Sequence, residues 1–295
     1  MTIPDVWTVV RMIEWATEYF HQREVPSPRL SIEWLLAHVL DVQRLELYLI
    51  FDRPLTEDER TQLRDMVKRR AAHEPLQYIC GECSFLNCTF RVDPSVLIPR
   101  QETEQLVHLF LESQSDVQTE RPILLDIGTG SGCIPISIQK QHPDWTCHGI
   151  DLSERALQNA RWNAERNGTA TEFHLCDLMS LTRENAPFPT PVNWIISNPP
   201  YIYPDEARQM EKEVLEYEPK VALFDENPLR FYEAILHFSA ATLRPEGSLW
   251  LECNPVDIDT IRSIATSSFD HIRVIEDLDQ VDRFLHCSNP RPTQP

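Results

Sequence analysis

The feature that most constrains the fold is a regular alternation of strand-like and helix-like segments from Pro122 onward. Seven short apolar runs have the character of strands: ILLDIG, TCHGID, TEFHLCD, NWIIS, GSLWLEC, IRVIED and RFLHC. Four helix-like segments lie between most of them: CIPISIQKQH, ERALQNARWNAERNG, EARQMEKEVLEYE and LRFYEAILHFSAATL. This alternation predicts parallel strands with right-handed crossovers, hence a doubly wound α/β sheet. The last two strands lack an intervening helix, so we expect a seven-stranded, mostly parallel sheet whose last two strands form an antiparallel hairpin.

Residues 1–80 show a different pattern, in which apolar residues recur at helical spacing and no strand-like run occurs. The pattern is clearest in three segments, 7–20, 27–40 and 56–73. We therefore expect a small helical bundle with Ser27 or Ser31 and Thr56 as N-caps, and we hypothesise separately that this bundle recognises the substrate. Three basic residues near the end of the last segment are expected to lie in solvent: Lys68, Arg69 and Arg70.

Residues 81–103 form the expected connector between this bundle and the α/β domain, which we place at 104–295. Two short strand-like runs, CSFLN and CTFRVD, follow one another directly with turn residues where they meet, and they predict a β-hairpin. The following segment, LIPRQETEQLV, leads into a helix for which Thr103 is the expected cap.

In a doubly wound sheet the ligand lies at the carboxyl ends of the strands. The first predicted strand ends in DIGTGSG, 126–132, where Gly128, Gly130 and Gly132 leave backbone that a ligand can approach closely. The second ends at Asp151, and its separation from Gly128 is about the 20 residues typical of dinucleotide sites. An acid at that point can accept hydrogen bonds from both hydroxyls of a ribose.

The third predicted strand ends at Asp177, and the fourth ends in Asn198-Pro199-Pro200-Tyr201. Each feature also has a purely structural interpretation: the glycines could make a tight turn, Asp151 could cap the helix that begins at Ser153, and Asp177 could be a solvated strand end. Their joint occurrence at successive strand ends favours a nucleoside site. The order GTGSGC differs from the GxGxxG of dinucleotide loops, and hydride transfer gives no reason for NPPY.

Composition narrows the function. The net charge is −19, and most of it lies in residues 101–295, which argues against a nucleic-acid substrate. The chain lacks an apolar run of the roughly 20 residues that span a bilayer, and its first residues lack signal-peptide character, so we expect a cytoplasmic protein. The cysteines are scattered, and CGEC at 80–83 has no second CxxC or histidine pair, so we expect a turn there and no metal site.

These motifs resemble a known family. Residues 122–288 resemble the Rossmann-like class I S-adenosylmethionine-dependent methyltransferases. The series DIGTGSG, GID, CDL and NPPY resembles that of the HemK/PrmC glutamine methyltransferases, which modify the Gly-Gly-Gln loop of peptide-chain release factors. The resemblance extends over nearly the whole chain through the helical N-terminal part, EPLQYICGE, LIPRQETEQLV and EPKVALFD. NPPY is shared with N6-adenine methyltransferases, and the two upstream segments make the assignment narrower.

The resemblance implies roles for the matching positions. S-adenosylmethionine is the implied cofactor, held by the residues Asp126, Gly128, Thr129, Gly130, Ser131, Gly132, Asp151, Asp177, Leu178 and Asn198. The loop should pass along the amino-acid end of the cofactor, Asp151 should take the ribose hydroxyls, and Asp177 with Leu178 should flank the adenine. The implied catalytic and substrate-binding residues are Asn198, Pro199, Pro200 and Tyr201. The implied partner is a class-1 release factor, methylated by a monomeric enzyme.

The NPPY residues suit methylation of an amide. An amide nitrogen is a poor nucleophile, so it must be held in line with the methyl–sulfonium bond. The Asn198 side-chain oxygen and the Pro199 carbonyl can accept its two hydrogens, proline rigidity keeps these acceptors in place, and Tyr201 offers a flat apolar face. No strong general base is needed, because the sulfonium leaves as a neutral thioether.

Three segments depart from the family pattern. Residues 224–228 lack the usual glycines, LECNP stands where E-I-G is common, and Gln101 stands where a proline is common. These departures affect the expected geometry on the substrate side. Alternative substrates are a ribosomal-protein glutamine and an adenine N6 in nucleic acid, and a non-catalytic cofactor-binding scaffold is a further alternative.

Overall fold

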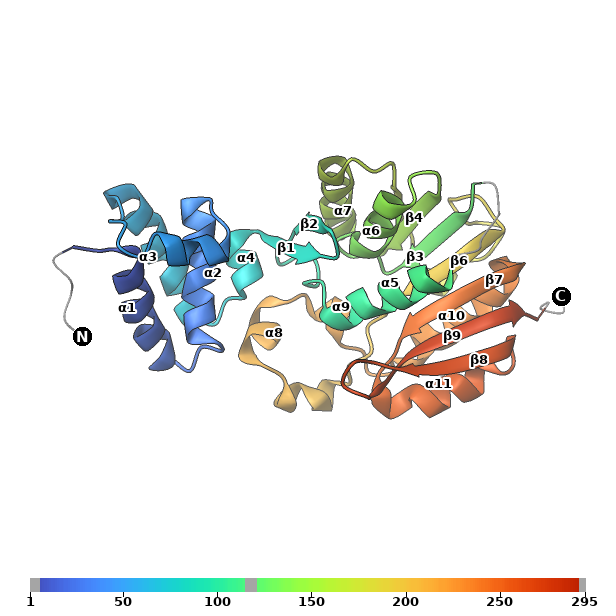
Figure 1. Cartoon of the computed structure of the whole chain (residues 1–295). Coiled ribbons are helices and arrows are strands. Elements are labelled where there is room, and N and C mark those ends of the chain that lie inside the picture. Colours follow the sequence, from blue (N-terminus) through green and yellow to red (C-terminus); the bar gives the residue numbers. More distant parts are fainter. Residues whose placement is uncertain (1–5, 115–120, 292–295) are drawn as a thin grey trace. The chain divides into compact units, whose positions relative to one another are not determined.

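The structure is a computed structural model that describes residues 6–114 and 121–291 of the chain. It divides into two compact units (Figure 1). The first contains 6–82 together with Met210–Tyr217, and the second contains Cys83–Gln209 and 218–291. None of the described helices is both long and apolar enough to cross a membrane.

The first unit is helical. Its elements in chain order are α1 (Val9–His21), α2 (Pro28–Leu40), the 3₁₀ helix η1 (Arg44–Leu49), α3 (Glu57–Ala71), α4 (Leu76–Cys80) and the distant α8 (Lys212–Tyr217). Apolar side chains from α1, α2, η1 and α3 form its core, including the fully buried Phe20, Ile32, Leu35, Leu47 and Leu63. The helical character expected for this part of the chain is confirmed.

The caps of these helices agree with the sequence in one case out of two. Thr56 makes a capping box with Glu59: the Thr56 hydroxyl accepts from Glu59 N at 3.3 Å, and a Glu59 carboxylate oxygen accepts from Thr56 N at 2.8 Å. Ser27 precedes α2 but makes no side-chain cap bond. Ser31 lies inside α2, so it is not a cap either. Its buried hydroxyl accepts from Arg70 Nε at 3.1 Å.

We expect Thr56→Ala to lower the free energy of unfolding of the protein by about 1 kcal/mol, because the backbone N–H of Glu59 loses the hydroxyl that accepts its hydrogen bond. Urea unfolding followed by far-UV circular dichroism measures the change. Thr61→Ala is the matched control, since Thr61 is exposed in the middle of α3 and its hydroxyl only donates to the Glu57 carbonyl. An equal loss in both variants would contradict the role of the cap.

The basic residues at the end of α3 are not all solvated. The expectation that they lie in solvent is wrong for Arg70, which is 4% exposed. Its guanidinium donates to Ser31 and to the Glu74 carbonyl, and it forms an ion pair with Glu213 of α8. The Tyr217 hydroxyl also donates to the Ala72 carbonyl at 2.8 Å. These contacts hold α8 in the helical unit.

The prediction of a single helix over 206–218 is wrong. The chain forms the 3₁₀ helix η3 (Pro204–Gln209), which belongs to the second unit, and then α8, which belongs to the first. Glu206 of η3 accepts from Asn254 Nδ2 at 3.2 Å, whereas α8 is held by Arg70 and Ala72. The two halves of the segment have partners in different units, and these contacts override its helical propensity.

The second unit is built on a seven-stranded sheet with the order β5-β4-β3-β6-β7-β9-β8. Its strands are β3 (Ile123–Ile127), β4 (Thr146–Asp151), β5 (Glu172–Leu175), β6 (Val192–Ser197), β7 (Leu243–Glu252), β8 (Phe269–Glu276) and β9 (Asp282–Pro290). The first five are parallel, and β9 pairs antiparallel with both β7 and β8. The predicted sheet, including its final hairpin, is confirmed.

Helices cover both faces of this sheet (Figure 1). One face packs against α5 (Gln101–Ser113), α6 (Cys133–Gln141) and α7 (Glu154–Asn167), and the other packs against α10 (Leu229–Thr242) and α11 (Ile258–Ala265). The remaining short elements are β1 (Glu82–Phe85), β2 (Cys88–Arg91), η2 (Leu178–Ser180), α9 (Lys220–Leu223) and η4 (Pro255–Asp257). The two strands β1 and β2 form the small sheet expected in the connector.

Candidate functional site

A cavity of about 410 Å³ lies at the carboxyl ends of β3, β4, β5 and β6. This is the position that the topology predicts for a ligand site. The expected residues on its wall are Gly128, Gly130, Asp151, Asp177, Leu178, Asn198, Pro199 and Pro200. Further lining residues are 95–97 and Pro219, Val221, Ala222 and Phe231. The structure thus brings the separate strand-end motifs to one place.

The glycine loop presents its backbone to this cavity. Gly128 and Gly130 have φ angles of +75° and +53°, which non-glycine residues rarely adopt. A Cβ built on Gly130 meets no atom within 4 Å, so the space beside it is open. The N–H of Gly128 donates to the Ile150 carbonyl at 2.9 Å, which fixes the loop against the end of β4.

The other residues of the loop face inward. Gly132, at the start of α6, has a φ of +81°, and a Cβ there would lie 2.8 Å from Ile136 Cδ1. It serves close helix packing. Thr129 and Ser131 are buried, and the Ser131 carbonyl accepts from Asn163 Nδ2 at 2.9 Å. The sequence predicts that these three residues contact a cofactor. In the structure they pack beneath the loop and are not among the residues that line the cavity.

Asp126 also lies beneath the loop. Its side chain is fully buried, and neither carboxylate oxygen has a hydrogen-bond partner among the described residues. Burial raises the pKa of Asp126 to about 7, and the nearby Asp151 charge adds to this shift. A carboxyl group with this pKa is partly protonated at neutral pH.

Asp151 joins the loop to the end of β4. Its Oδ2 accepts from Gly130 N and its Oδ1 accepts from Ser153 N, both at 2.9 Å. Burial raises its pKa, and these two backbone N–H groups oppose the rise. The cap of α7 is Ser153, whose hydroxyl accepts from Ala156 N at 3.2 Å, so the alternative that Asp151 is that cap is wrong. Its predicted bond to a ribose stays a prediction.

The next strand end supplies Asp177 and Leu178. Asp177 caps the short η2 helix by accepting from Met179 N at 2.9 Å, and Leu178 provides an apolar part of the wall beside Cys176. Both residues line the cavity, and their predicted contact with an adenine stays a prediction.

The NPPY segment follows β6. Asn198, Pro199 and Pro200 line the cavity, and the Asn198 side-chain nitrogen donates to Thr103 Oγ1 at 3.0 Å. The Tyr201 hydroxyl donates to Glu252 Oε1 at 3.0 Å. Burial, followed by the Glu252 charge, raises the Tyr201 pKa well above its usual value, so this phenol stays protonated.

Two residues behind NPPY were missed by the sequence reasoning. Glu252 ends β7, is fully buried, and accepts from both Tyr201 and the Thr103 hydroxyl, the latter at 2.7 Å. Thr103 is not the expected cap, because α5 begins at Gln101 and Thr103 lies within its first turn with its side chain on Glu252. A signal was present: LWLEC places an acid at the end of an apolar strand, as the earlier strand ends do.

Two of the segments that carry the family resemblance, IPRQETE and EPKVALFD, also meet. Arg100 of IPRQETE forms an ion pair with Glu218 of EPKVALFD, and Glu218 accepts from Ile98 N at 3.2 Å. The glycine-free loop at 224–228 is ordered by Asp225, which accepts from Asn227 N at 2.8 Å and forms an ion pair with Arg230. The backbone N–H of Asp225 donates to the carbonyl of Ile202 at 3.1 Å, and Ile202 directly follows the NPPY segment.

The departure at LECNP has a structural role. Asn254 Nδ2 donates to the Tyr201 carbonyl at 3.0 Å, and its Oδ1 accepts from Val256 N at 3.2 Å. The side chain of Asn254 thus connects the end of β7 to the chain that follows NPPY. A glycine at this position, as in the common E-I-G pattern, has no side chain to make that hydrogen bond.

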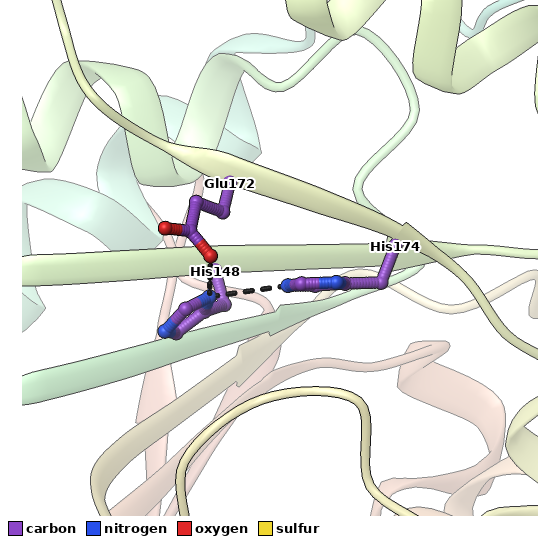
Figure 2. Close-up of side chains that lie close together, drawn as sticks. All are labelled: His148, Glu172 and His174. Atoms are coloured by element: carbon purple, nitrogen blue, oxygen red, sulfur yellow. Dashed lines mark hydrogen bonds and ion pairs between the residues drawn. The ribbon is translucent and has the colours of Figure 1, made fainter.

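A second polar cluster lies on strands β4 and β5 (Figure 2). His148 Nδ1 is 3.2 Å from His174 Nε2 and 3.7 Å from a Glu172 carboxylate oxygen. Burial lowers the pKa of both histidines, so the rings are neutral at pH 7. A metal-ligating histidine normally donates its other N–H to an acceptor, but His148 Nε2 has no partner among the described residues. Glu172 is 66% exposed. We interpret the cluster as a hydrogen-bonded imidazole pair.

The thiols of the CGEC segment are not activated. Burial raises the pKa of Cys80 to about 12 and that of Cys83 to about 11. All eight cysteines lie in the described part of the chain and are free. Because the thiolate is the nucleophile and the metal ligand, these shifts work against redox or metal chemistry at this segment.

The sheet order, the antiparallel β9 and the glycine loop facing the NPPY segment together define a Rossmann-like class I methyltransferase. The catalytic domain of hMettl16, solved in complex with a MAT2A 3′UTR hairpin, has this fold, with a TM-score of 0.53 and 13% identity. The alignment covers 83% of this chain and 87% of that chain. The predicted fold class is confirmed.

Sequence comparison assigns the family. Residues 11–81 match the PrmC N-terminal domain, and 101–220 match the methyltransferase small domain. The release factor glutamine methyltransferase of Chlorobaculum tepidum is 36% identical over 96% of this chain and 97% of its own length. The release factor glutamine methyltransferase of Bacteroides thetaiotaomicron is 40% identical over 85% of this chain and 89% of its own length. The chain belongs to the release factor glutamine methyltransferase family, and the predicted HemK/PrmC resemblance is confirmed.

Proposed function

We propose that the protein transfers a methyl group from S-adenosylmethionine to the side-chain amide nitrogen of the glutamine in the Gly-Gly-Gln motif of class-1 release factors. The observation that carries the proposal is that Asn198 and Pro199 line the same cavity as Gly128, Gly130 and Asp151. Groups suited to an amide therefore lie beside groups suited to a nucleoside. The names of the relatives, release factor glutamine methyltransferases, support the choice of substrate.

The residues present fit the cofactor. The cavity volume lies within the range of roughly 300–1,000 Å³ usual for small-ligand sites. Gly128 and Gly130 would lie along the amino-acid end, and the Asp151 carboxylate would accept from the ribose hydroxyls. Asp177 and Leu178 would flank the adenine. When bound, S-adenosylmethionine supplies an electrophilic methyl group on a sulfonium.

The chain's own residues orient the nucleophile. The Asn198 side-chain oxygen and the Pro199 carbonyl accept the two N–H groups of the substrate amide and so aim its nitrogen. Pro199 and Pro200 have fixed φ angles, which keeps these acceptors in place before the substrate arrives. The Tyr201 ring is held by the bond from its hydroxyl to Glu252. The product amide loses its extra proton to water after transfer.

The experiment that tests the proposal offers methyl-labelled S-adenosylmethionine with four substrates in parallel: release factor, ribosomal protein, DNA and RNA. We expect label in release factor and its loss when the glutamine of the Gly-Gly-Gln motif is replaced by alanine. Label in ribosomal protein alone would assign the activity to a different glutamine. Label in nucleic acid alone would replace the proposed reaction by adenine methylation.

We propose that the helical unit binds a part of the protein substrate that lies away from the reacting glutamine. Binding energy from this remote part can support the orientation of the glutamine at the reacting centre. Its η1 helix exposes Leu45 and Leu49 by 69% and 85%. We expect the double variant Leu45→Ser, Leu49→Ser to raise KM for intact release factor by about thirtyfold, because each of the two lost leucine contacts contributes about 1 kcal/mol.

The same variant should methylate a short Gly-Gly-Gln peptide at the parent kcat/KM, because such a peptide lacks the remote part of the release factor that the helical unit is proposed to bind. The matched control is Leu278→Ser, which changes a leucine that is 84% exposed at the β8–β9 turn of the other unit. An unchanged KM for intact release factor would show that η1 is not part of the recognition surface.

A further inference from the structure

The buried Glu252 carboxylate is connected to the cavity through a chain of hydrogen bonds. Thr103 Oγ1 donates to Glu252 Oε2 at 2.7 Å, and Asn198 Nδ2 donates to Thr103 Oγ1 at 3.0 Å. The other carboxylate oxygen of Glu252 accepts from the Tyr201 hydroxyl at 3.0 Å. Glu252 itself is buried and is not among the residues that line the cavity, so its effect on the cavity passes through the side chains of Thr103, Asn198 and Tyr201.

While Glu252 is ionised, the chemistry of the three groups fixes the direction of this chain of hydrogen bonds. An ionised carboxylate can only accept hydrogen bonds, so the single proton of the Thr103 hydroxyl goes to Glu252. The hydroxyl can then only accept from its other neighbour. Asn198 must therefore turn its NH₂ toward Thr103, and its carbonyl oxygen faces the opposite way. Because Asn198 lines the cavity, that oxygen is the acceptor available to a bound molecule.

We propose that Glu252 and Thr103 are positioning residues that set the orientation of the Asn198 amide and thereby present its oxygen to the substrate amide. The inference rests on the proposed function. It assigns to Glu252 a role that a structural hydrogen bond would not require. If the Asn198 amide were turned over, its NH₂ would face the N–H groups of the substrate, and two donors would oppose each other.

The charge state of Glu252 controls this relay. Protonation would make Glu252 a donor to Thr103, free the Thr103 proton, and permit the turned-over Asn198. The titratable or charged groups that face Glu252 are Glu102 on α5, Tyr201 after NPPY, Tyr232 on α10, Cys253 beside it and Arg283 on β9. Burial raises the Glu252 pKa, with Glu102 adding to the rise, while the bonds from Thr103 and Tyr201 and the Arg283 charge oppose it.

The test compares two near-isosteric variants with the parent enzyme. Glu252→Gln places an amide that can donate to Thr103, and Thr103→Val removes the hydroxyl. We expect kcat to fall by about ten- to a hundredfold in both, since a displaced acceptor at the reacting centre costs about this much. Affinity for S-adenosylhomocysteine should stay at the parent value. Thr103→Ser, which keeps the hydroxyl, should retain the parent kcat.

Three further readouts separate positioning from folding. The decline of the parent kcat toward acid that arises from Glu252 should be absent in Glu252→Gln. Combined with Asn198→Ala, Glu252→Gln should lower kcat no further, because both act on one interaction. The control Ser248→Ala changes another buried polar residue of β7, whose hydroxyl accepts from Trp250 Nε1 at 3.2 Å, and should keep the parent kcat.

A readout without substrate keeps this inference distinct from the proposed function. The side-chain amide resonance of Asn198 in asparagine-labelled protein should shift in Glu252→Gln and Thr103→Val but not in Ser248→Ala. A parent enzyme that leaves release factor unlabelled overturns the proposed function alone. An unshifted Asn198 resonance, or a parent-like kcat in Glu252→Gln, overturns the relay.

Discussion

Asn198→Ala is expected to lower the turnover of methyl transfer by about a hundred- to a thousandfold, the usual effect of removing one preorganised polar contact at a reacting centre. The variant loses the side-chain oxygen that aims the target nitrogen, and the Pro199 carbonyl remains. The fold should persist, because Asn198 lines a cavity and is only partly buried. Single-turnover methylation with saturating cofactor and release factor measures the effect.

Asn198→Gln is the companion variant, because it keeps the amide and moves it by one methylene group. We expect a loss similar to that of Asn198→Ala, since the position of the acceptor and not its chemical type determines the alignment. Binding of S-adenosylhomocysteine, measured by calorimetry, should remain near the parent value in both. Transfer at the parent rate in either variant would remove the role proposed for Asn198, and a selective loss of cofactor binding would assign Asn198 to the cofactor instead.

The strand ends explain why much of the site could be predicted. In a parallel doubly wound sheet, successive carboxyl ends lie side by side, so Gly130, Asp151, Asp177 and Asn198 had to come together once the strands were recognised. Each strand is a short apolar run with clear turn residues, and this pattern is local. The antiparallel pairing of the last two strands follows from the same pattern and from their short connection.

The parts that failed depend on distant partners. Thr103 has the residue type of a cap, and only the position of β7 shows that its hydroxyl is used by Glu252. Arg70 has the spacing of a solvated helix end, but Glu213, far along the chain, forms an ion pair with it. A loop can expose one glycine and bury the next: Gly130 opens to the cavity while Gly132 packs against Ile136. The apolar periodicity of the sequence does not predict which distant residue a side chain will contact, or which glycine will be buried.

Asp151→Ala is expected to weaken S-adenosylhomocysteine binding by about ten- to a hundredfold, because a charged acceptor is worth roughly 1.5–3 kcal/mol. The structure adds a second contribution: Gly130 N loses its acceptor, so the glycine loop loses one of the bonds that order it. Calorimetry at neutral pH measures the affinity. Asp144→Ala is the matched control, because it removes an equal charge from an exposed site before the opposite end of β4.

The pH dependence of the same affinity supplies the decisive comparison. Burial raises the pKa of Asp151, and the group accepts from ribose hydroxyls best when it is ionised. Binding to the parent protein should therefore be strongest above that raised pKa and weaken as the pH falls through it. In Asp151→Ala this contribution is gone, so the affinity should depend less on pH. An affinity and a pH profile equal to those of the parent would mean that Asp151 only orders Gly130 and Ser153, with no bond to the ribose.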